Sequence, residues 1–564
     1  MVLLSVAGPR AEEGRAARAE AAVLLLAAIL AVWNVWGYDL WAPDEPYFGE
    51  GAREMVADGR WIVPHVGGEV TTDKPPLFFW LIALLSLPWG AVTSLSARLP
   101  SVVASVGTVA LTMRLSRRLG DDRGGALAGA VLSVLYLFWD KSRSAQIDAL
   151  LTFLVLAALS AFEAYRSGRA SGLRAGLLFW TAAALAVLAK GPVGVALPLG
   201  IALATLAFDR NLGAWRRFAP LAGPALFTGI VAAWAAGATW GGGGEYSVWG
   251  AFREHVLDRA LHGMHHRQPV WYYAEILPVQ LLPWSGLLPG ALLLAWRRRR
   301  EGADRFLLVA SAFVVLLFTL SVEKRDLYVL PAYPFFAIAF ARLLRHVDRP
   351  AVESRPGLPA DPRWVLLPQG IAGGIFVAAS LALPLAAPRY LPGAAAAFAL
   401  LAAVLAVGGG GMIVAARSGR PRAAAAATIA AAAAAYVTAA SAVFPAIDPA
   451  RSARALAEAV RDETAAFRAR GGRVLAFGVG NLPEAIALYS GGVYLREVAG
   501  AAELDRALGE EAGAWVVAER SKLESLPRSV SACLRVVRSA EISRRTISLA
   551  VEVREGGDRA GYFP

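Results

Sequence analysis

An acidic pair opens the stretch of the chain whose residue types are best suited to acid–base chemistry. Asp44 and Glu45 precede a helical pattern that runs to about Ala57 and stops at Gly59. A carboxylate here can act as a general base or ligate a metal at a membrane surface. It can equally cap the helix at Asp44, with Glu45 favoured by the helix dipole. Composition alone leaves both roles open.

Two lysines lie at breaks between apolar segments. Lys74 precedes two prolines and an aromatic run, and Lys190 precedes a Gly-Pro pair between two long apolar runs. An ammonium at headgroup depth can hold a lipid phosphate. Lys74 can instead be a simple anchor, with its aliphatic stem buried and its charge in water. A boundary between spans explains the Gly-Pro after Lys190 but leaves the lysine itself unexplained.

Two further residues begin apolar runs. Asp148 opens one run, where helix capping is the simplest explanation for an acid. Tyr328 opens another, shortly after Lys324 and Arg325. A tyrosine beside a cation can orient a phosphate, so Tyr328 is a candidate ligand for one.

The loop at 251–273 holds four of the six histidines. The spacing of His255, Arg259, His262 and His266 puts them on one helical face, which is compatible with a metal site or with a wet interfacial helix. Asp73, His255 and His262 are the candidate metal ligands. The sequence has no Walker lysine loop, no Gly-x-Ser-x-Gly elbow and no His-Glu-x-x-His, so it supports neither ATP hydrolysis, serine hydrolysis nor zincin proteolysis.

The composition is that of a polytopic membrane protein. Of the 564 residues, 57% are hydrophobic and 18% charged, whereas soluble domains average roughly 25% charged residues. The net charge of +12 is better explained by cytoplasmic anchoring loops than by nucleic acid. The single cysteine, Cys533, excludes an intrachain disulfide and a cysteine-based metal cluster.

Apolar runs of spanning length predict about thirteen transmembrane helices. The segment 77–87 is too short to span and is predicted to be an interfacial or re-entrant helix. Arginines concentrate in alternate loops, which places the N-terminus inside and the C-terminus outside. The predicted spans are 20–38, 99–116, 124–140, 149–165, 174–189, 192–208, 218–238, 274–296, 305–322, 326–344, 364–386, 393–415 and 423–443.

This topology gathers the chemically equipped loops, including 39–98 and 240–273, on the outer face. Polar residues on one membrane face are typical of an active site at the edge of the bilayer. Residues 1–447 are predicted to form the transmembrane catalytic domain. Residues 448–564 are more charged, and five short strand patterns alternating with helical ones predict a small outer α/β domain.

Several motifs together resemble one family. They are Leu40-Trp41-x-Pro43-Asp44-Glu45, Arg53-Glu54-Met55, Gly59-x-Trp61-Ile62-Val63-Pro64-His65, Lys74-Pro75-Pro76-Leu77, Ala97-Arg98-Leu99-Pro100-Ser101, Asp148, Lys190-Gly191-Pro192 and Tyr328-x-Leu330-Pro331. Their order and spacing resemble the bacterial aminoarabinose transferase of lipid A and the related dolichyl-phosphate-mannose–protein mannosyltransferases. The resemblance implies the GT-C fold. Pro46 and Asp73 depart from the residues usual in that family.

The resemblance also implies a function. The family transfers a sugar, with inversion, from a polyprenyl-phosphate carrier to lipid A, another glycan or a protein at the outer face of the bacterial inner membrane. By this resemblance Asp44, Glu45 and Asp148 are the acidic residues of the site. Lys74, Lys190, Arg259 and Tyr328 then bind the donor phosphate. No cofactor is required, although a divalent metal is possible, and no nucleic acid partner is expected. A transporter or lipid flippase is the alternative from another class, but such proteins usually show repeated halves, and none is visible here.

Overall fold

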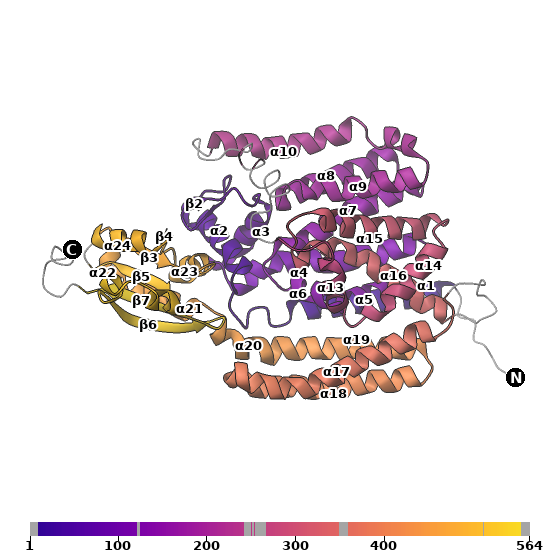
Figure 1. Cartoon of the computed structure of the whole chain (residues 1–564). Coiled ribbons are helices and arrows are strands. Elements are labelled where there is room, and N and C mark those ends of the chain that lie inside the picture. The colour runs from indigo at the N-terminus through magenta and orange to yellow at the C-terminus, as the bar shows by residue number, and fades with distance from the viewer. Residues whose placement is uncertain are drawn as a thin grey trace. The chain divides into compact units, whose positions relative to one another are not determined.

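The computed structural model describes residues 9–120, 124–241, 250, 253, 267–348, 359–510 and 513–553. The chain divides into two compact units (Figure 1). We call them the helical unit and the mixed unit. The helical unit comprises Met1–Val35, Thr72–Phe78 and Arg98–Val443, and the mixed unit comprises Trp36–Thr71, Phe79–Ala97 and Phe444–Pro564.

The helical unit is built from apolar helices joined by short polar turns. In chain order they are α1 (Pro9–Val32), α4 (Ser94–Arg118), α5 (Gly125–Ser133), α6 (Tyr136–Ser142), α7 (Ile147–Arg166), α8 (Gly172–Lys190), α9 (Val193–Phe208), α10 (Ala222–Gly241), α13 (Tyr272–Gln280), α14 (Leu288–Arg297), α15 (Gly302–Leu320), the 3-10 segment η5 (Asp326–Ala332), α16 (Tyr333–Val347), α17 (Arg363–Tyr390), α18 (Ala395–Arg417) and α19 (Pro421–Thr438).

Nine helices among the described residues are long and apolar enough to cross a membrane, or ten if the bent pair α13–α14 is one span. The apolar window of α7 is 89% buried inside the protein, whereas those of α10 and α18 are 11% and 17% buried. Helices that expose so much apolar surface are stable only when lipid, and not water, surrounds them. The membrane class is therefore confirmed, while the number thirteen stays a prediction.

Two of the predicted spans are broken in the structure. The run 124–140 divides into α5 and α6, because the backbone becomes extended at Leu135 and the amide of Tyr136 bonds to the carbonyl of Leu282 instead of to its own helix. The run 274–296 divides into α13 and α14, which are bent by 118°. Pro283 lies in that break and has no N–H with which to continue a helix. The segment predicted as too short to span forms α3 (Leu77–Ser86), a helix of 10 residues.

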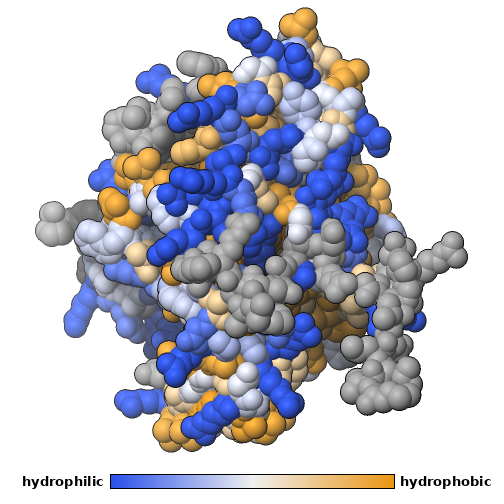
Figure 2. Space-filling view, turned by 90° about the vertical axis from the view of Figure 1, so that its right-hand side faces the viewer, coloured by the Kyte–Doolittle hydropathy of each residue, from blue (hydrophilic) through white to orange (hydrophobic). Residues whose placement is uncertain are grey.

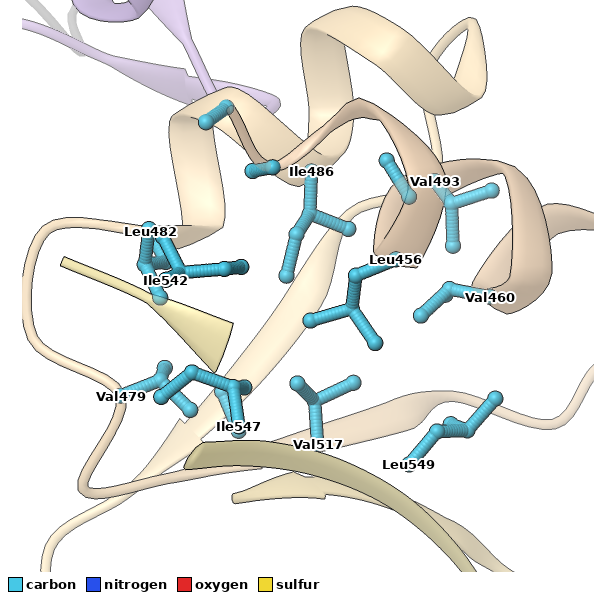
Figure 3. Packing of buried hydrophobic residues seen from close by; sticks show 14 of the residues in the cluster. Leu456, Val460, Val479, Leu482, Ile486, Val493, Val517, Ile542, Ile547 and Leu549 are labelled. Carbon is cyan, nitrogen blue, oxygen red and sulfur yellow. The ribbon is translucent and has the colours of Figure 1, made fainter. Parts of the chain in front are cut away.

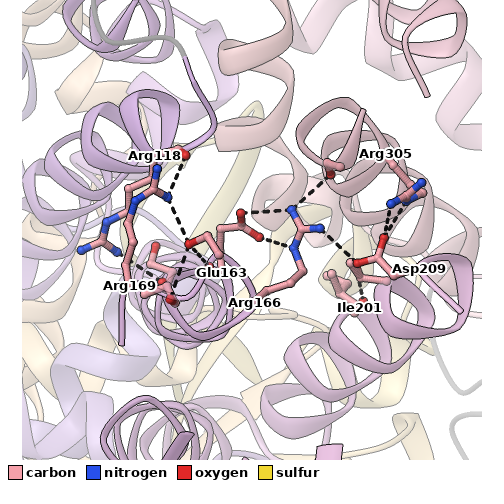
Figure 4. Close-up of polar contacts among 12 residues, drawn as sticks. Arg118, Glu163, Arg166, Arg169, Ile201, Asp209 and Arg305 are labelled. Carbon is pink, nitrogen blue, oxygen red and sulfur yellow. Dashed lines mark hydrogen bonds and ion pairs between the residues drawn. The ribbon is translucent and has the colours of Figure 1, made fainter. Parts of the chain in front are cut away.

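Partly buried ion pairs join helix ends within the helical unit (Figure 4). Arg166, in the last turn of α7, donates to Glu163 at 2.6 and 3.0 Å and to Asp209 at 3.0 Å, and Asp209 also accepts from Arg305. Arg169 bonds to the carbonyl of Arg118 at 2.9 Å. Loops that the sequence places on one side of the membrane therefore meet at one end of the unit. Figure 2 shows hydrophilic residues gathered on this end of the helices.

The mixed unit contains a five-stranded sheet in the order β4-β3-β5-β7-β6. The first three strands are parallel and the last two run antiparallel to their neighbours. Each of the five predicted strands is present, although the fourth was predicted to end at Val537 and runs on to Ile542. The strands are β3 (Val474–Phe477), β4 (Leu495–Val498), β5 (Trp515–Glu519), β6 (Leu534–Ile542) and β7 (Arg545–Glu552). The helices of this part are α21 (Arg454–Glu463), α22 (Ala465–Arg468), α23 (Pro483–Ser490), α24 (Ala501–Glu510), α25 (Arg520–Glu524) and α26 (Arg528–Ser531).

Helices cover both faces of this sheet. Leu456 and Val460 of α21 and Ile486 of α23 pack over Val517 and Leu549 on one face (Figure 3). On the other face, leucines of α24 pack over the remaining side chains of β3 and β5. All four residues of β3 are buried, as expected for a strand with helices on both sides.

The mixed unit also includes the segment that carries the acidic pair. Here α2 (Asp44–Asp58) is followed by a hairpin of β1 (His65–Val66) and β2 (Glu69–Val70). The hydroxyl of Tyr489 accepts from the Leu40 amide at 2.6 Å, and Asp448 accepts from the Trp41 indole at 2.7 Å. Gly49 allows close packing, because a Cβ there would lie 3.1 Å from Leu488. Residues 36–71 are thus held by the C-terminal part of the chain.

Candidate functional site

An ion pair in the helical unit joins two of the predicted site residues. Asp148 is the second residue of α7 and Lys190 is the last residue of α8, and the lysine Nζ donates to Asp148 Oδ1. The cap position of α7 is held by Gln146, whose side chain makes no cap bond. The pairing, rather than helix capping, therefore accounts for an acid at 148, and it also accounts for a lysine at the end of an apolar helix.

Tyr328 lies beside the same lysine. The Nζ of Lys190 is 4.6 Å from the centre of the Tyr328 ring, a cation–π distance. The positive charges of Lys74 and Arg325 also act on Lys190. Lys190 thus interacts electrostatically with two further cations as well as with Asp148. Cations grouped in this way can attract an anionic ligand.

Lys74 is itself paired. Its Nζ lies 2.5 Å from Oδ2 of Asp73, and the two side chains are 19% and 34% exposed. Asp73 was predicted as a metal ligand, and the structure places it as the ion-pair partner of Lys74, which was predicted to bind phosphate. The pair is partly buried and joins neighbours in the sequence, so Lys74 can exchange Asp73 for an anionic ligand without a change in the fold.

Polar residues of α13 fix the segment before Tyr328, and the sequence analysis did not identify them. Tyr273 donates to the carbonyl of Arg325 at 3.0 Å, and the amide of Gln280 donates to the carbonyl of Asp326 at 3.0 Å. The hydroxyl of buried Tyr333 lies 3.3 Å from Gln280 Oε1. The position of Gln280 within an apolar run could have identified this contact in the sequence, because a buried amide needs hydrogen-bond partners.

Asp44 and Glu45 belong to the mixed unit. Pro43 holds the cap position of α2 without a side-chain cap bond, and Asp44 is the first helical residue. Glu45 is 7% exposed, and its Oε2 accepts from the Trp41 amide at 3.0 Å. The end of α2 is as predicted: Gly59 adopts a φ of +70° and its amide bonds to the carbonyl of Met55.

A second carboxyl cluster on α2 escaped the sequence analysis. Glu50 is fully buried and accepts two bonds from Arg53, at 2.7 and 2.8 Å, and Arg53 also donates to the hydroxyl of Tyr494 at 3.1 Å. Glu54 is 1% exposed, and one of its oxygens accepts from the Gly68 amide at 3.0 Å. Burial raises the pKa of Glu50 to about 7, although the bonds from Arg53 oppose this. The three charged residues share one face of α2, and their i, i+3 and i+4 spacing was the missed signal.

The raised pKa of Glu50 predicts a pH-dependent stability. A carboxyl with a higher pKa in the folded than in the unfolded chain stabilises the fold most below pH 4.5, and this contribution is lost as the pH rises to about 7. Glu50→Gln keeps an acceptor for Arg53 but does not titrate. We expect the difference in unfolding free energy between pH 4.5 and pH 7.5 to shrink by on the order of 2 kcal/mol in this variant. Denaturant unfolding of the full chain at both pH values measures it, and an unchanged difference would contradict the assignment.

The remaining predicted site residues, Arg259, His255 and His262, lie outside the described residues. Among the residues that are described, no group of three or more His, Cys, Asp or Glu side chains is arranged to hold a metal ion. The expectations that no cofactor is required and that a metal is possible both stay predictions. The described site is built from Asp148, Lys190 and Tyr328, with the charges of Lys74 and Arg325.

Comparisons with known proteins bear on the family and the fold. A family model described as dolichyl-phosphate-mannose-protein mannosyltransferase matches residues 73–235. An undecaprenyl phosphate-alpha-4-amino-4-deoxy-L-arabinose arabinosyl transferase of Pseudomonas aeruginosa is 33% identical over 303 residues, which cover 52% of this chain and 54% of the relative. The enzyme of the same name from Pectobacterium carotovorum is 31% identical over 395 residues, covering 68% of each chain. The match thus spans about half the length of the first relative and two thirds of the second.

Solved structures share the fold. ArnT from Cupriavidus metallidurans bound to undecaprenyl phosphate superposes with a TM-score of 0.72 at 18% identity, over 94% of this chain and 97% of that one. The oligosaccharyltransferase AglB from Archaeoglobus fulgidus superposes with a TM-score of 0.51 at 12% identity, over 90% and 70% of the two chains.

These similarities confirm the predicted GT-C fold with a small C-terminal α/β part. The apolar helices and the bacterial relatives together identify a multi-pass protein of the bacterial inner membrane. The Pectobacterium enzyme is 31% identical to this chain over two thirds of its length, which is sufficient to assign the family. The chain belongs to the aminoarabinose transferase family of GT-C glycosyltransferases.

Proposed function

We propose that this protein transfers a sugar from a polyprenyl-phosphate carrier to an acceptor at the outer face of the inner membrane. The observation that carries the proposal is the cluster of Lys190, Asp148 and Tyr328, with the positive charges of Lys74 and Arg325 beside it. The names of the relatives make undecaprenyl phosphate the carrier and 4-amino-4-deoxy-L-arabinose the first sugar to test. A lipid A-like glycolipid is the first acceptor to test, ahead of another glycan or a protein. Family membership favours this enzyme over a transporter or flippase.

The reaction is a displacement at the anomeric carbon. The acceptor oxygen forms a bond to C1 of the sugar with inversion, and the bond from C1 to the phosphate oxygen breaks. The electron pair of that bond leaves with the polyprenyl phosphate, which gains negative charge. Lys190 and Lys74 stabilise this charge, Arg259 assists, and Tyr328 orients the phosphate. Asp148 keeps Lys190 charged and in position. The resemblance to the family assigns Asp44, with Glu45 beside it, as the base that takes the proton of a hydroxyl acceptor.

Substitution of two cations that are proposed to bind the donor phosphate tests this function. Lys74→Ala and Arg259→Ala should each raise the KM for the lipid-linked sugar about tenfold, because each removes one charge-assisted bond. Turnover is followed as transfer of labelled sugar by the purified protein in detergent. Normal turnover of both variants at limiting donor would contradict the assignment. An unchanged melting temperature shows that neither variant has unfolded.

We also propose that the active site and the C-terminal part face the periplasm and that the N-terminus is cytoplasmic. In a Cys533→Ser background, exposed Ser525→Cys should react with a membrane-impermeant maleimide in intact spheroplasts. Ser418→Cys, which is exposed in the turn after α18, should react only after permeabilisation. The opposite pattern would invert the topology and with it the proposed side of the reaction.

A further inference from the structure

The mixed unit contains a cleft that is lined by none of the residues assigned to the proposed reaction. Its volume is about 800 Å³, which is within the range of small-molecule sites. One wall is the turn of the β1–β2 hairpin, at Gly67 and Gly68, and the other walls come from α22, α23 and the start of β3 and β4. All lining residues belong to the same compact unit.

The lining is strongly polar. Arg468 at the end of α22, Arg473 before β3 and Arg496 on β4 face it, together with Glu69, Glu484 and Glu497. Arg468 donates to the Thr464 hydroxyl at 3.0 Å and to the Arg461 carbonyl at 2.9 Å. A guanidinium has five N–H donors, more than these two bonds use. Alternating donors and acceptors of this kind suit a ligand rich in hydroxyl groups and exclude an alkyl chain.

One acceptor in the cleft is unsatisfied. Oε2 of Glu484 is buried and has no hydrogen-bond partner among the described residues. Burial also raises the pKa of this carboxyl. Buried oxygens without a donor are rare in native proteins. Glu484 lines the cleft, and a turn of its carboxylate toward the cleft would bring this oxygen to a hydroxyl or amino group of a bound ligand.

An aromatic ring completes the wall. The ring of Tyr494 is 39% exposed, and its hydroxyl accepts from Arg53 at 3.1 Å, which fixes its position. Gly68 makes room for it, since a Cβ at Gly68 would lie 3.0 Å from the ring. The half-exposed Tyr494 presents the apolar face of its ring beside a polar hydroxyl. The C–H face of a sugar ring is also apolar and can pack on it.

We propose that this cleft binds the saccharide headgroup of the acceptor, a sugar with hydroxyl or amino groups and an anionic substituent. Glu484 accepts from the hydroxyl or amino groups, and Tyr494 packs on the ring. Arg468 and Arg473 pair with the anion, since Arg496 is ion-paired with Glu510 at 2.9 Å. The identification of this ligand as the acceptor rests on the proposed function. The binding of a saccharide in the cleft does not depend on it. In the proposed reaction, the cleft gives the C-terminal part a role in choosing the acceptor.

The test is direct binding to the purified full chain, without donor and without turnover. The probe is a phosphorylated glucosamine disaccharide lacking acyl chains, with inorganic phosphate as a second probe. We expect Arg473→Ala and Glu484→Ala each to raise the Kd of the disaccharide about tenfold. The matched control is Arg520→Ala, which removes an exposed arginine of the same unit that is ion-paired with Glu524 at 2.9 Å and does not line the cleft. Its Kd should stay within twofold.

Three outcomes overturn the inference. They are no binding of the disaccharide by the wild-type chain, equal Kd values in all variants, and competition by inorganic phosphate as strong as by the disaccharide. Where transfer is measurable, the two cleft variants should raise the KM for the acceptor and leave the KM for the donor unchanged. Disaccharide binding that depends on Arg473, in a protein that transfers no lipid-linked sugar, would reject the proposed function and keep the cleft as a saccharide site.

Discussion

Lys190→Met is expected to lower kcat/KM for sugar transfer by about 10²–10³-fold, the loss seen when one preorganised charge stabiliser is removed. The ammonium of Lys190 contacts both Asp148 and the ring of Tyr328, and the lysine side chain is 14% exposed. A positive charge held in such a water-poor place acts strongly on the phosphate oxygen as the bond to C1 breaks. Methionine keeps an unbranched side chain, one atom shorter than that of lysine, and removes the charge together with its N–H donors.

The partner of Lys190 provides the control. Loss of the lysine alone leaves Asp148 buried and unpaired, which destabilises a protein whatever its chemistry. Lys190→Met combined with Asp148→Asn removes both charges. If Lys190 serves only to neutralise Asp148, the double variant regains activity. If Lys190 stabilises the leaving phosphate, the double variant recovers its melting temperature but not its turnover. The two readouts separate the structural role from the proposed one.

Asp44→Asn is expected to reduce turnover by about 10²–10⁴-fold when the acceptor is a hydroxyl, because the attacking oxygen then loses its base. Donor binding should be unchanged, so the loss falls on kcat. The earlier alternative was a helix cap, for which asparagine would serve equally well. Pro43 occupies that cap position, so Asp44 is not needed there. A phosphate acceptor is already an anion and needs no base, and the substitution would then have effects that pH or added divalent metal alter.

Asp58→Asn is the matched control for Asp44→Asn, since Asp58 is the exposed last residue of the same helix. It makes the same chemical change at the other end of α2 and should leave turnover within twofold of wild type. Full activity of Asp44→Asn would remove Asp44 from the mechanism and move the search for the base to Glu45 or Asp148. Equal losses in both variants would point to a general effect of charge on α2.

Hydropathy and periodicity were sufficient for much of the architecture. The apolar runs gave the membrane class and most of the helix positions, because burial in lipid demands long uninterrupted apolar helices. The alternation of short strands and helices in 448–564 predicted all five strands, since each strand there has its own local signal. The motifs with Asp44, Lys74, Asp148, Lys190 and Tyr328 were enough to suggest the family.

Tertiary structure decided which of these residues meet. Asp148 and Lys190 are 42 residues apart in sequence, and nothing local to either one shows that they form an ion pair. The break between α5 and α6 depends on a bond from Tyr136 to Leu282, which no window of neighbouring residues contains. The close packing of residues 36–71 with 444–564 has the same origin. Hydropathy is a property of each segment, whereas ion pairs and backbone bonds between distant segments exist only once the chain has folded.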